Sequence, residues 1–428
     1  MRSQQGKMAA VVLAAGRGER MGGDGPKVLE PILGKPMLDW VLARIDEAGI
    51  KSSFVIIGYQ GERVREHFRE RRRVCCIRQA RQLGTADAVR TALPYLAGYN
   101  EILVLCGDTP LFRTESLRLL IREHRLQRNA ATFLSAEIPD PTGYGRVIRK
   151  NGQVTAIVEE KSASGAERQI REVNTGAYVF QKKGLAEMIR SLSANSIGEF
   201  YLTDLIHLWA EQGLSVNAIK LADYNEGWGV NSPDEWIRAA VILKNRILDR
   251  YRRQGVTIID PATTCVSEGV RIGKGTTVYP FTMIESDVTV GEKCHIGPFA
   301  HLRPGSQVQA QAEIGNFVEV TRTRIGKKTK AKHLSYLGDA QIGDYVNIGA
   351  GTITANYDGK QKHKTVIEDN VMIGSHTTLV APVRVGKRAI TGAGCVVLKR
   401  KNVPPRAVVV GVPARVLKNS ERSENVTH

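Results

Sequence analysis

A glycine-rich loop that follows the first apolar run of the chain carries residue types that bind phosphate. Residues 13–21 read LAAGRGERM, and Lys27 follows closely. Glycines at the end of a strand let backbone N–H groups approach a phosphate, while Arg20 and Lys27 can supply positive charge. The spacing matches neither the GxGxxG of dinucleotide-binding folds nor the GK[ST] of a Walker loop, which argues against both. Taken alone, the loop is equally compatible with a simple tight turn.

Two further side chains have chemistry of interest. Asp108 ends the apolar run EILVLCGD at residues 101–108. Ligands of parallel sheets bind at the carboxyl ends of the strands, so Asp108 and the glycine-rich loop should meet at one site. The alternative is a turn carboxylate without a ligand. His333 lies among basic residues in an interruption of a sequence repeat, which favours a binding role over the structural role of most isolated histidines.

The elements that position the first group of residues predict an α/β domain. Apolar runs lie at residues 8–15, 54–58, 101–108, 131–138 and 174–180, and helical patterns lie between them, for example at 36–48 and 115–127. This alternation is typical of a Rossmann-like domain with a mainly parallel sheet. Residues 232–255 begin with Ser-Pro, carry apolar residues at helical spacing and end at glycine. We therefore predict a domain at residues 1–231 and a linker helix at residues 232–255.

The second half of the chain repeats with a period of six residues. Aliphatic or threonine residues occupy these positions: Ile272, Val278, Ile284, Val290, Ile296, Leu302, Val308, Ile314 and Val320, then Ile342, Ile348 and Thr354, then Ile367, Ile373, Leu379, Val385, Thr391 and Val397. This period predicts a parallel β-helix with three short sides, and the glycines that follow many of these residues predict tight corners. Insertions in such a solenoid line binding surfaces, which makes the breaks at 321–341 and 356–364 candidate site segments. We assign residues 256–428 to this domain, with a disordered polar tail.

Composition sets limits on partners and location. The 428 residues exceed what one core usually serves, and the six cysteines have no CxxC spacing that would indicate a zinc site or disulfide framework. The net charge of +18 is compatible with nucleic acid, but aromatics are only 6% and are not interleaved with the basic runs. A small anionic substrate accounts for the charge as well. Without a signal peptide or transmembrane pattern, we expect a cytoplasmic protein that binds neither nucleic acid nor membrane.

Eight motifs of the first domain resemble those of the sugar-1-phosphate nucleotidyltransferases. They are LAAGRGERM with PKVL, QLGTADA (82–88), LCGDTP (105–110), GYGR (143–146), IVEEK (157–161), NTG (174–176), GEFYLTD (198–204) and GVN (229–231). Together with the repeat, the order resembles the family of bifunctional N-acetylglucosamine-1-phosphate uridylyltransferases and glucosamine-1-phosphate N-acetyltransferases. The resemblance implies acetyl transfer from acetyl-CoA to glucosamine-1-phosphate, then uridylyl transfer from UTP to N-acetylglucosamine-1-phosphate. The product would be a precursor of peptidoglycan and lipopolysaccharide.

The resemblance also implies roles for residues of the first domain. The positions that would hold UTP or the sugar phosphate are Leu13, Ala14, Ala15, Gly16, Gln79, Gly84, Thr85, Gly107, Gly145, Glu159 and Asn174, with Lys27 at the UTP phosphates. Asp108 and Asn231 would bind Mg²⁺, the implied cofactor. The chemistry is consistent, because phosphoryl-type transfer depends on positioning and charge neutralisation and needs no protein nucleophile.

In the second domain, the resemblance identifies His333 of HLSYLGD with a general base that takes a proton from the 2-amino group of glucosamine-1-phosphate. The positions that would hold glucosamine-1-phosphate are Arg303, Tyr336, Asn347 and Lys364, and those that would contact acetyl-CoA are Ala350, Asn356, Tyr357, Ser375 and Ala393. A left-handed β-helix and a homotrimer with the acetyl-transfer site between subunits are likewise implied.

Three departures from the family pattern leave alternatives open. Thr321 stands where a phosphate-binding lysine is usual, and Gly411 stands where an arginine that contacts coenzyme A is usual. The start of the repeat is also shorter than usual, by roughly two coils of ~18 residues. One alternative is a monofunctional nucleotidyltransferase with a structural or regulatory β-helix. A non-enzymatic scaffold is another, although Lys27, Asp108 and Asn231 argue against it.

Overall fold

The computed structural model describes residues 7–18, 21, 24–195 and 198–417, which form two compact units. The units divide between Ile242 and Leu243, inside helix α7 (Pro233–Arg253). This helix occupies the segment in which the sequence predicts a linker helix. Within the described ranges, no helix combines the length and apolar character needed to span a membrane.

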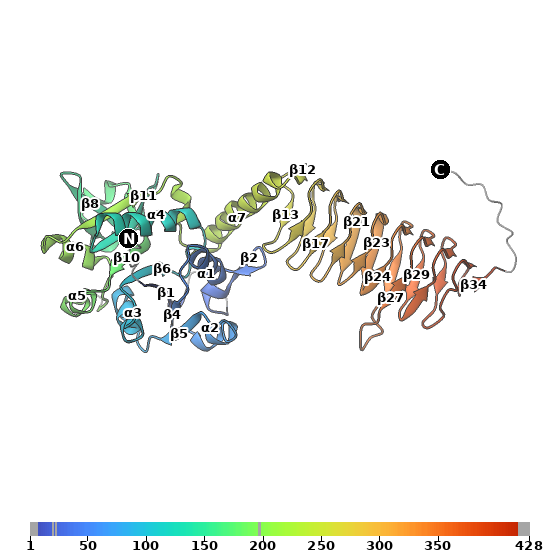
Figure 1. Ribbon diagram of the computed structural model, residues 1–428, viewed down its shortest axis with the longest axis horizontal. Coiled ribbons are helices and arrows are strands. Elements are labelled where there is room, and N and C mark those ends of the chain that lie inside the picture. The colour runs from blue at the N-terminus through green and yellow to red at the C-terminus, as the bar shows by residue number, and fades with distance from the viewer. Residues whose placement is uncertain (1–6, 19–20, 22–23, 196–197, 418–428) are drawn as a thin grey trace, which may run out of the picture. The chain divides into compact units, whose positions relative to one another are not determined.

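The first unit is built on a nine-stranded, mainly parallel sheet with helices on both faces (Figure 1). Its strands are β1 (Met8–Ala14), β4 (Ser53–Ile57), β5 (Val74–Arg78), β6 (Glu101–Cys106), β7 (Ala131–Glu137), β8 (Arg146–Lys150), β9 (Gln153–Val158), β10 (Glu172–Gln181) and β11 (Val216–Lys220). Its helices are α1 (Met37–Glu47), α2 (Gly61–His67), α3 (Thr85–Ala92), α4 (Thr114–Gln127), α5 (Leu185–Ser191) and α6 (Asp204–Glu211). A hairpin of β2 (Pro31–Ile32) and β3 (Lys35–Pro36) and the short 3₁₀ helices η2 (Lys27–Leu29), η3 (Leu93–Leu96), η4 (Glu160–Ser162), η5 (Glu167–Gln169) and η6 (Tyr224–Gly227) complete it.

The central strands of this unit are buried on both faces. The sheet order is β11-β7-β10-β6-β1-β4-β5, and β1 pairs in parallel with both β4 and β6. In β1, Ala9 and Val11 join the core under α3, α5 and α6, while Ala10 and Val12 join the core under α1, α2 and α4. A strand covered by helices on both sides has no polar face, which explains the continuous apolar run in the sequence. The predicted α/β class with a mainly parallel sheet is confirmed.

The second unit is a parallel β-helix with three sides (Figure 1). The first side contains β12 (Thr257–Ile258), β15 (Thr277–Val278), β18 (His295–Ile296), β25 (Asn347–Ile348), β28 (Met372–Ile373), β31 (Ile390–Thr391) and β33 (Val408–Val410), to which β34 (Arg415–Val416) adds antiparallel. The second contains β13 (Cys265–Val266), β16 (Met283–Ile284), β19 (His301–Leu302), β26 (Ile353–Ala355), β29 (Thr378–Val380) and β32 (Val396–Val397). The third contains β14 (Arg271–Ile272), β17 (Thr289–Val290), β20 (Gln307–Val308), β22 (Arg324–Ile325), β24 (Ala340–Ile342), β27 (Thr365–Ile367) and β30 (Val383–Val385). Strands β21 (Glu313–Thr321) and β23 (Lys330–Gly338) continue from the first side into the second.

The six-residue period fills the interior of the β-helix. All of the predicted inward positions are buried, from Ile272 at 8% exposure to Val320 at 0%. Coils of 18 residues pair Thr277 with His295, whereas the break at 321–341 shortens the coil to 17 and pairs Gln307 with Arg324. The second break is an insertion that begins after β26, and the chain resumes the inward phase at Ile367. The predicted parallel β-helix is confirmed.

The corners of the β-helix differ in detail from the prediction. The glycines beside the inward residues are needed for close approach between coils. A Cβ on Gly315 would lie 2.1 Å from the carbonyl oxygen of Lys332. The left-handed backbone occurs elsewhere on the coil and is adopted by side chains such as Phe281, Asp287 and Lys293. Steric room therefore explains glycine beside the inward residue at positions such as Gly315, whereas Gly297 also has a positive φ of 95°.

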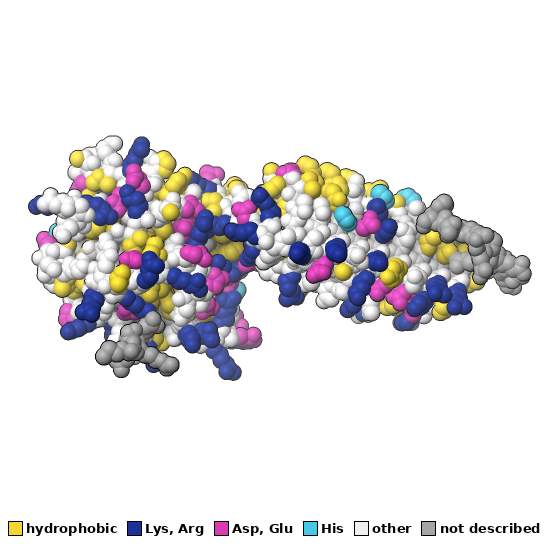
Figure 2. Space-filling model, turned by 45° about the horizontal axis from the view of Figure 1, so that its top comes forward, with side chains coloured by type: hydrophobic (Ala, Val, Ile, Leu, Met, Phe, Trp, Pro, Cys, Tyr) yellow, Lys and Arg dark blue, Asp and Glu magenta, His cyan; other side chains and the backbone are white. Residues whose placement is uncertain are grey.

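One corner of the second unit carries an exposed stack of aromatic rings. Phe281, Phe299 and Phe317 lie in successive coils, with ring centroids 4.8 Å apart at both steps. Between 42% and 57% of each residue is exposed. On the face drawn in Figure 2, hydrophobic side chains gather along one edge of this unit. Such an unpartnered apolar edge is common at contacts between protein copies.

Candidate functional site

The carboxyl ends of β1 and β6 open into a pocket of about 380 Å³ in the first unit. The pairing of these strands brings the glycine-rich loop and Asp108 together, and the Gly107 amide donates to the Leu13 carbonyl at 2.8 Å. The pocket is lined by these predicted residues: Leu13, Ala15, Gly16, Gln79, Gly84, Thr85 and Asp108. Ala14 ends β1 and is buried in the core beneath. Arg20 lies outside the described residues.

Lys27 joins two oxygen-bearing side chains beside this pocket. Its Nζ donates to Asp108 Oδ2 at 2.5 Å and to Asn231 Oδ1 at 2.8 Å. Short helix η2 fixes Lys27 because Val28, the next residue, is buried in the core. Asn231 lies beside Lys27 because the backbone N–H of Val230, the preceding residue, donates to the backbone carbonyl of Asp108 at 2.8 Å. Three residues separated by up to 204 positions thus meet at the strand ends.

The oxygens of Asp108 and Asn231 fit a hard divalent cation. Both contact the same ammonium, so they converge on one position of cation size. Across the described residues, no cluster of three or more His, Cys, Asp or Glu side chains could hold a metal ion by itself. Mg²⁺ is usually bound by one or two protein oxygens together with substrate phosphates and water, so a two-residue set is sufficient.

A second set of predicted residues forms a neighbouring part of the first unit. The backbone N–H of Asn174 donates to the Gly145 carbonyl at 2.8 Å. A Cβ on Gly145 would lie 3.4 Å from the Glu159 carboxyl carbon. Glu159 accepts from Thr203 Oγ1 at 2.9 Å. Burial raises the pKa of Glu159 above its usual value, and the Thr203 hydrogen bond opposes this shift. The group can bind hydroxyls of a sugar through carboxylate and amide.

Sequence reasoning missed several residues of this site. Gln82, Ala88, Cys106, Glu199 and Tyr201 also line the nucleotide pocket. All five fall in the quoted motifs QLGTADA, LCGDTP and GEFYLTD, which were a usable signal. Burial raises the pKa of the Cys106 thiol to about 12, so it contributes a neutral, apolar wall.

His333 lies on the surface of the second unit, in β23. It lines a cavity of about 390 Å³ with Tyr279, His295, Glu313 and Lys332 among its walls. Within the described part of the chain, no hydrogen bond engages its ring, whereas its carbonyl accepts from Ser335 Oγ at 2.8 Å. An exposed imidazole without an internal partner is available for proton transfer to a ligand.

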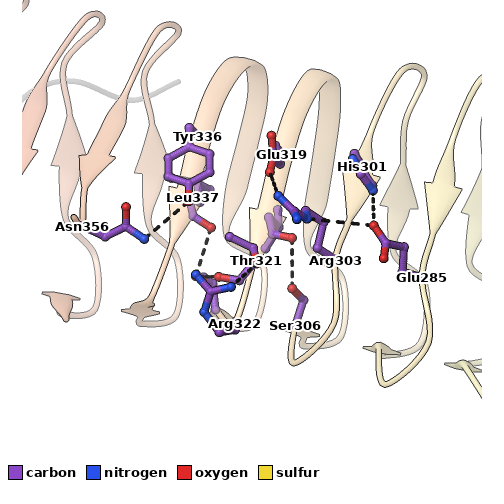
Figure 3. Close-up of polar contacts among 12 residues, drawn as sticks. Glu285, His301, Arg303, Ser306, Glu319, Thr321, Arg322, Tyr336, Leu337 and Asn356 are labelled. Atoms are coloured by element: carbon purple, nitrogen blue, oxygen red, sulfur yellow. Dashed lines mark hydrogen bonds and ion pairs between the residues drawn. The ribbon is translucent and has the colours of Figure 1, made fainter. Parts of the chain in front are cut away.

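Three other predicted residues gather on the second side of the β-helix (Figure 3). Tyr336 pairs in register with Glu319, which forms an ion pair of 2.8 Å with Arg303. Asn356 is buried and donates to the Tyr336 hydroxyl at 3.4 Å. This cluster combines a guanidinium, a phenol and an amide, which suits a phosphorylated sugar.

The remaining predicted residues of this unit lie on other parts of the coil. Ala350, Ser375 and Ala393 form one row, because the Gly394 amide donates to the Ser375 carbonyl at 2.8 Å and His376 donates to Ala350. Asn347 is exposed on the first side, in β25. Tyr357 is exposed in the inserted loop, and Lys364 donates to Gln341 on the third side at 3.1 Å. One copy of the chain therefore spreads the predicted acetyl-transfer residues over different sides of the β-helix.

The departure at Thr321 has a clear structural setting (Figure 3). Thr321 is only 2% exposed, so its side chain belongs to the interior and not to the sugar-phosphate surface expected from the sequence. Arg322 forms a two-point ion pair with Asp339, at 2.6 and 2.8 Å. This contact, together with Asn356 and Lys362, lowers the pKa of Asp339. Lys362 is thus the lysine of the inserted loop that acts on this cluster, whereas Lys364 points to another side.

Comparisons with known proteins cover both units. The family described as a MobA-like NTP transferase domain matches residues 10–190, and the bacterial transferase hexapeptide family matches residues 269–303 and 364–399. A curated relative from Geobacillus sp. (strain WCH70), named "Bifunctional protein GlmU", is 40% identical over 450 residues, covering 97% of each chain. Relatives of the same name from Pelobacter propionicus and Pelotomaculum thermopropionicum are 42% and 43% identical, covering 94% and 88% of this chain and 95% and 90% of their own. The first alignment is longer than this chain, so that relative carries insertions relative to it.

Proposed function

The chain belongs to the family of bifunctional GlmU proteins, and from this premise we propose which of its residues carry the two transfers. The protein is a nucleotidyltransferase and a glucosamine-1-phosphate acetyltransferase that together make UDP-N-acetylglucosamine, a precursor of the cell envelope. The relatives share this two-part organisation over nearly the whole chain, which favours it over a single transferase with a structural repeat.

For uridylyl transfer, we assign UTP to the pocket at the ends of β1 and β6. An oxygen of the N-acetylglucosamine-1-phosphate phosphate attacks the α-phosphorus, one P–O bond forms, and the bond to the departing pyrophosphate breaks. Lys27 neutralises phosphate charge, and Glu159 and Asn174 orient the sugar. Asp108 and Asn231 would hold Mg²⁺, which supplies further charge neutralisation when bound. The observation that carries this assignment is the convergence of Lys27, Asp108 and Asn231 beside the pocket.

For acetyl transfer, we assign the general base to His333. The 2-amino nitrogen of glucosamine-1-phosphate attacks the thioester carbonyl of acetyl-CoA, the C–S bond breaks, and coenzyme A leaves as a thiolate. His333 takes the proton released by the nitrogen. We assign the sugar phosphate to Arg303 and Tyr336 with Asn347 and Lys364, and acetyl-CoA to these residues: Ala350, Asn356, Tyr357, Ser375 and Ala393.

We further propose that three copies of the chain assemble through their β-helices. Two observations support this. The acetyl-transfer residues are spread over different sides of one β-helix, so a neighbouring copy can complete the site. The exposed aromatic stack of Phe281, Phe299 and Phe317 also offers an apolar edge for association. Sedimentation equilibrium at micromolar concentration should give three times the chain mass of 47.0 kDa.

Two coupled assays test the assignment of the sites. Thiol release from acetyl-CoA with glucosamine-1-phosphate reports the first transfer, and pyrophosphate release from UTP with N-acetylglucosamine-1-phosphate reports the second. We expect His333→Ala to abolish thiol release and to leave pyrophosphate release within about twofold, with Asp108→Ala doing the reverse. Asp108 and His333 lie in separately packed units, so each variant is the control for the other. Loss of both activities from either change contradicts the two-site assignment.

A further inference from the structure

We propose that Asp87 is a positioning residue that makes the nucleotide pocket selective for uracil, because it holds the side-chain amide of Gln79 in one orientation. The inference rests on the proposed function, since it takes the pocket at β1 and β6 as the UTP site. Gln79 lines this pocket and Asp87 lies behind it, in the first turn of α3.

Both amide hydrogens of Gln79 are directed at acceptors of the protein. Nε2 donates to Asp87 Oδ2 at 2.7 Å and to the Gly84 carbonyl oxygen at 3.3 Å. An ionised carboxylate and a carbonyl oxygen accept hydrogen bonds and cannot donate them. A half-turn of the amide would place its oxygen against two acceptors and lose both bonds. The chemistry of the partners thus fixes which end of the amide faces inward.

The carboxylate that holds Gln79 is itself held. Asp87 is 6% exposed and its second oxygen, Oδ1, accepts from Arg90 Nη2. A negative charge in the first turn of a helix is also stabilised by the helix dipole. Because either oxygen of the carboxylate can only accept, the orientation of the Gln79 amide does not depend on the contact between Oδ1 and Arg90.

The remaining polar atom of Gln79 is its carbonyl oxygen, Oε1. Among the described residues, none donates a hydrogen bond to it, although 95% of Gln79 is shielded from solvent and the side chain lines the pocket. A ligand that brings a donor therefore satisfies this atom, and a ligand that brings an acceptor leaves it unpaired.

Uracil and cytosine differ at N3, the ring position that can pair with the Gln79 carbonyl oxygen. N3 of uracil carries a hydrogen and donates, whereas N3 of cytosine is an acceptor. A site built to bond one N–H discriminates strongly against the analogue that lacks it, since the buried acceptor then loses its partner. Asp87 acts without touching the base, because it removes the alternative orientation in which Gln79 would offer its NH₂ group.

The test compares UTP with CTP in the pyrophosphate-release assay, using N-acetylglucosamine-1-phosphate, magnesium and the full chain. In Asp87→Asn, the new amide can present either its oxygen or its NH₂ to Gln79, so both orientations of Gln79 become accessible. We expect the ratio of kcat/KM for UTP over CTP to fall by about 10-fold or more. Arg90→Gln is the matched control, because it breaks the same ion pair but keeps the carboxylate against Gln79, and its ratio should stay within about 2-fold of the unchanged protein.

An unchanged ratio in a folded Asp87→Asn protein overturns the proposal, as does an equal loss of selectivity in Arg90→Gln. A second measurement needs no variant. UTP methylated at N3 cannot donate to Oε1, and we expect the unchanged protein to use it at least about 10-fold less well than UTP. Equal use of both nucleotides also overturns the proposal. Failure of the proposed function gives a different result, namely no pyrophosphate from UTP in the unchanged protein.

Discussion

Replacement of Lys27 by methionine should damage the uridylyl site in two measurable ways. The ammonium contacts Asp108 at 2.5 Å, and the two side chains are 10% and 23% exposed. At this separation and an effective dielectric constant of ~20, the Coulomb attraction is about 7 kcal/mol. Desolvation of both charges cancels most of it, which leaves a net contribution of about 2 kcal/mol, typical of a hydrogen bond between charged groups.

Loss of this contact should lower the melting temperature of the first unit by about 4–8 °C, at about 2–4 °C per kcal/mol for a domain of this size. The double variant Lys27→Met/Asp108→Asn removes both charges, so we expect it to recover more than half of that loss. Differential scanning calorimetry without nucleotide or magnesium measures both effects. A double variant no more stable than Lys27→Met would show that an unpaired Asp108 charge is not the cause.

The same substitution removes a cation from the phosphates during uridylyl transfer. Removal of one preorganised charge or donor typically costs about 10²–10³ in rate, and we expect that loss in pyrophosphate release. Thiol release from acetyl-CoA is the internal control and should stay within about twofold. Pyrophosphate release within about threefold of the unchanged protein would refute the role of Lys27.

Two further predictions concern the response of stability to pH. Burial lowers the pKa of His124 to about 4, so between about pH 6.5 and 4 the unfolded chain binds a proton that the folded chain does not. The free energy of unfolding should fall by about 3 kcal/mol as the pH drops through this window, and His124→Gln should make it depend less on pH. Equal dependence on pH in the two proteins, measured by denaturant unfolding, would contradict this. Burial raises the pKa of Glu159, so its neutral form favours folding and this contribution is lost as the pH rises through the raised value. The melting temperature of Glu159→Gln relative to the unchanged protein should therefore increase from pH 4 to pH 8, and a constant difference would contradict the reasoning.

The sequence predicts the architecture well, because the interior of each unit imposes a period on the chain. The inward positions of the β-helix could be read at six-residue spacing, and Ile284, Leu302 and Val320 are all fully buried. The function of the glycines could not be read in the same way. Whether a glycine serves a positive φ or a close approach depends on the neighbouring coil, as at Gly315, and local sequence does not contain that distance.

The site was predicted at the level of residues but not of contacts. Asp108 and the glycine-rich loop meet because both follow strands of one parallel sheet, which a strand pattern predicts. The bond between Lys27 and Asn231 spans 204 positions and needs the whole fold. The contact between Asp87 and Gln79 could not be predicted, since the sequence does not specify the path of the turn between them.

The regular coil of the second unit has a consequence for how such a chain changes in length. Each complete coil adds 18 residues and one strand spacing of about 4.8 Å. Gain or loss of a whole coil leaves the side chains of all remaining coils facing the same way, because the strands on either side of the change still meet equivalent neighbours. The rings of Phe281, Phe299 and Phe317 repeat at this spacing, with centroids 4.8 Å apart. The height of the unit can therefore vary only in discrete increments of one coil, whereas extra residues that do not complete a coil form a loop, as they do after β26.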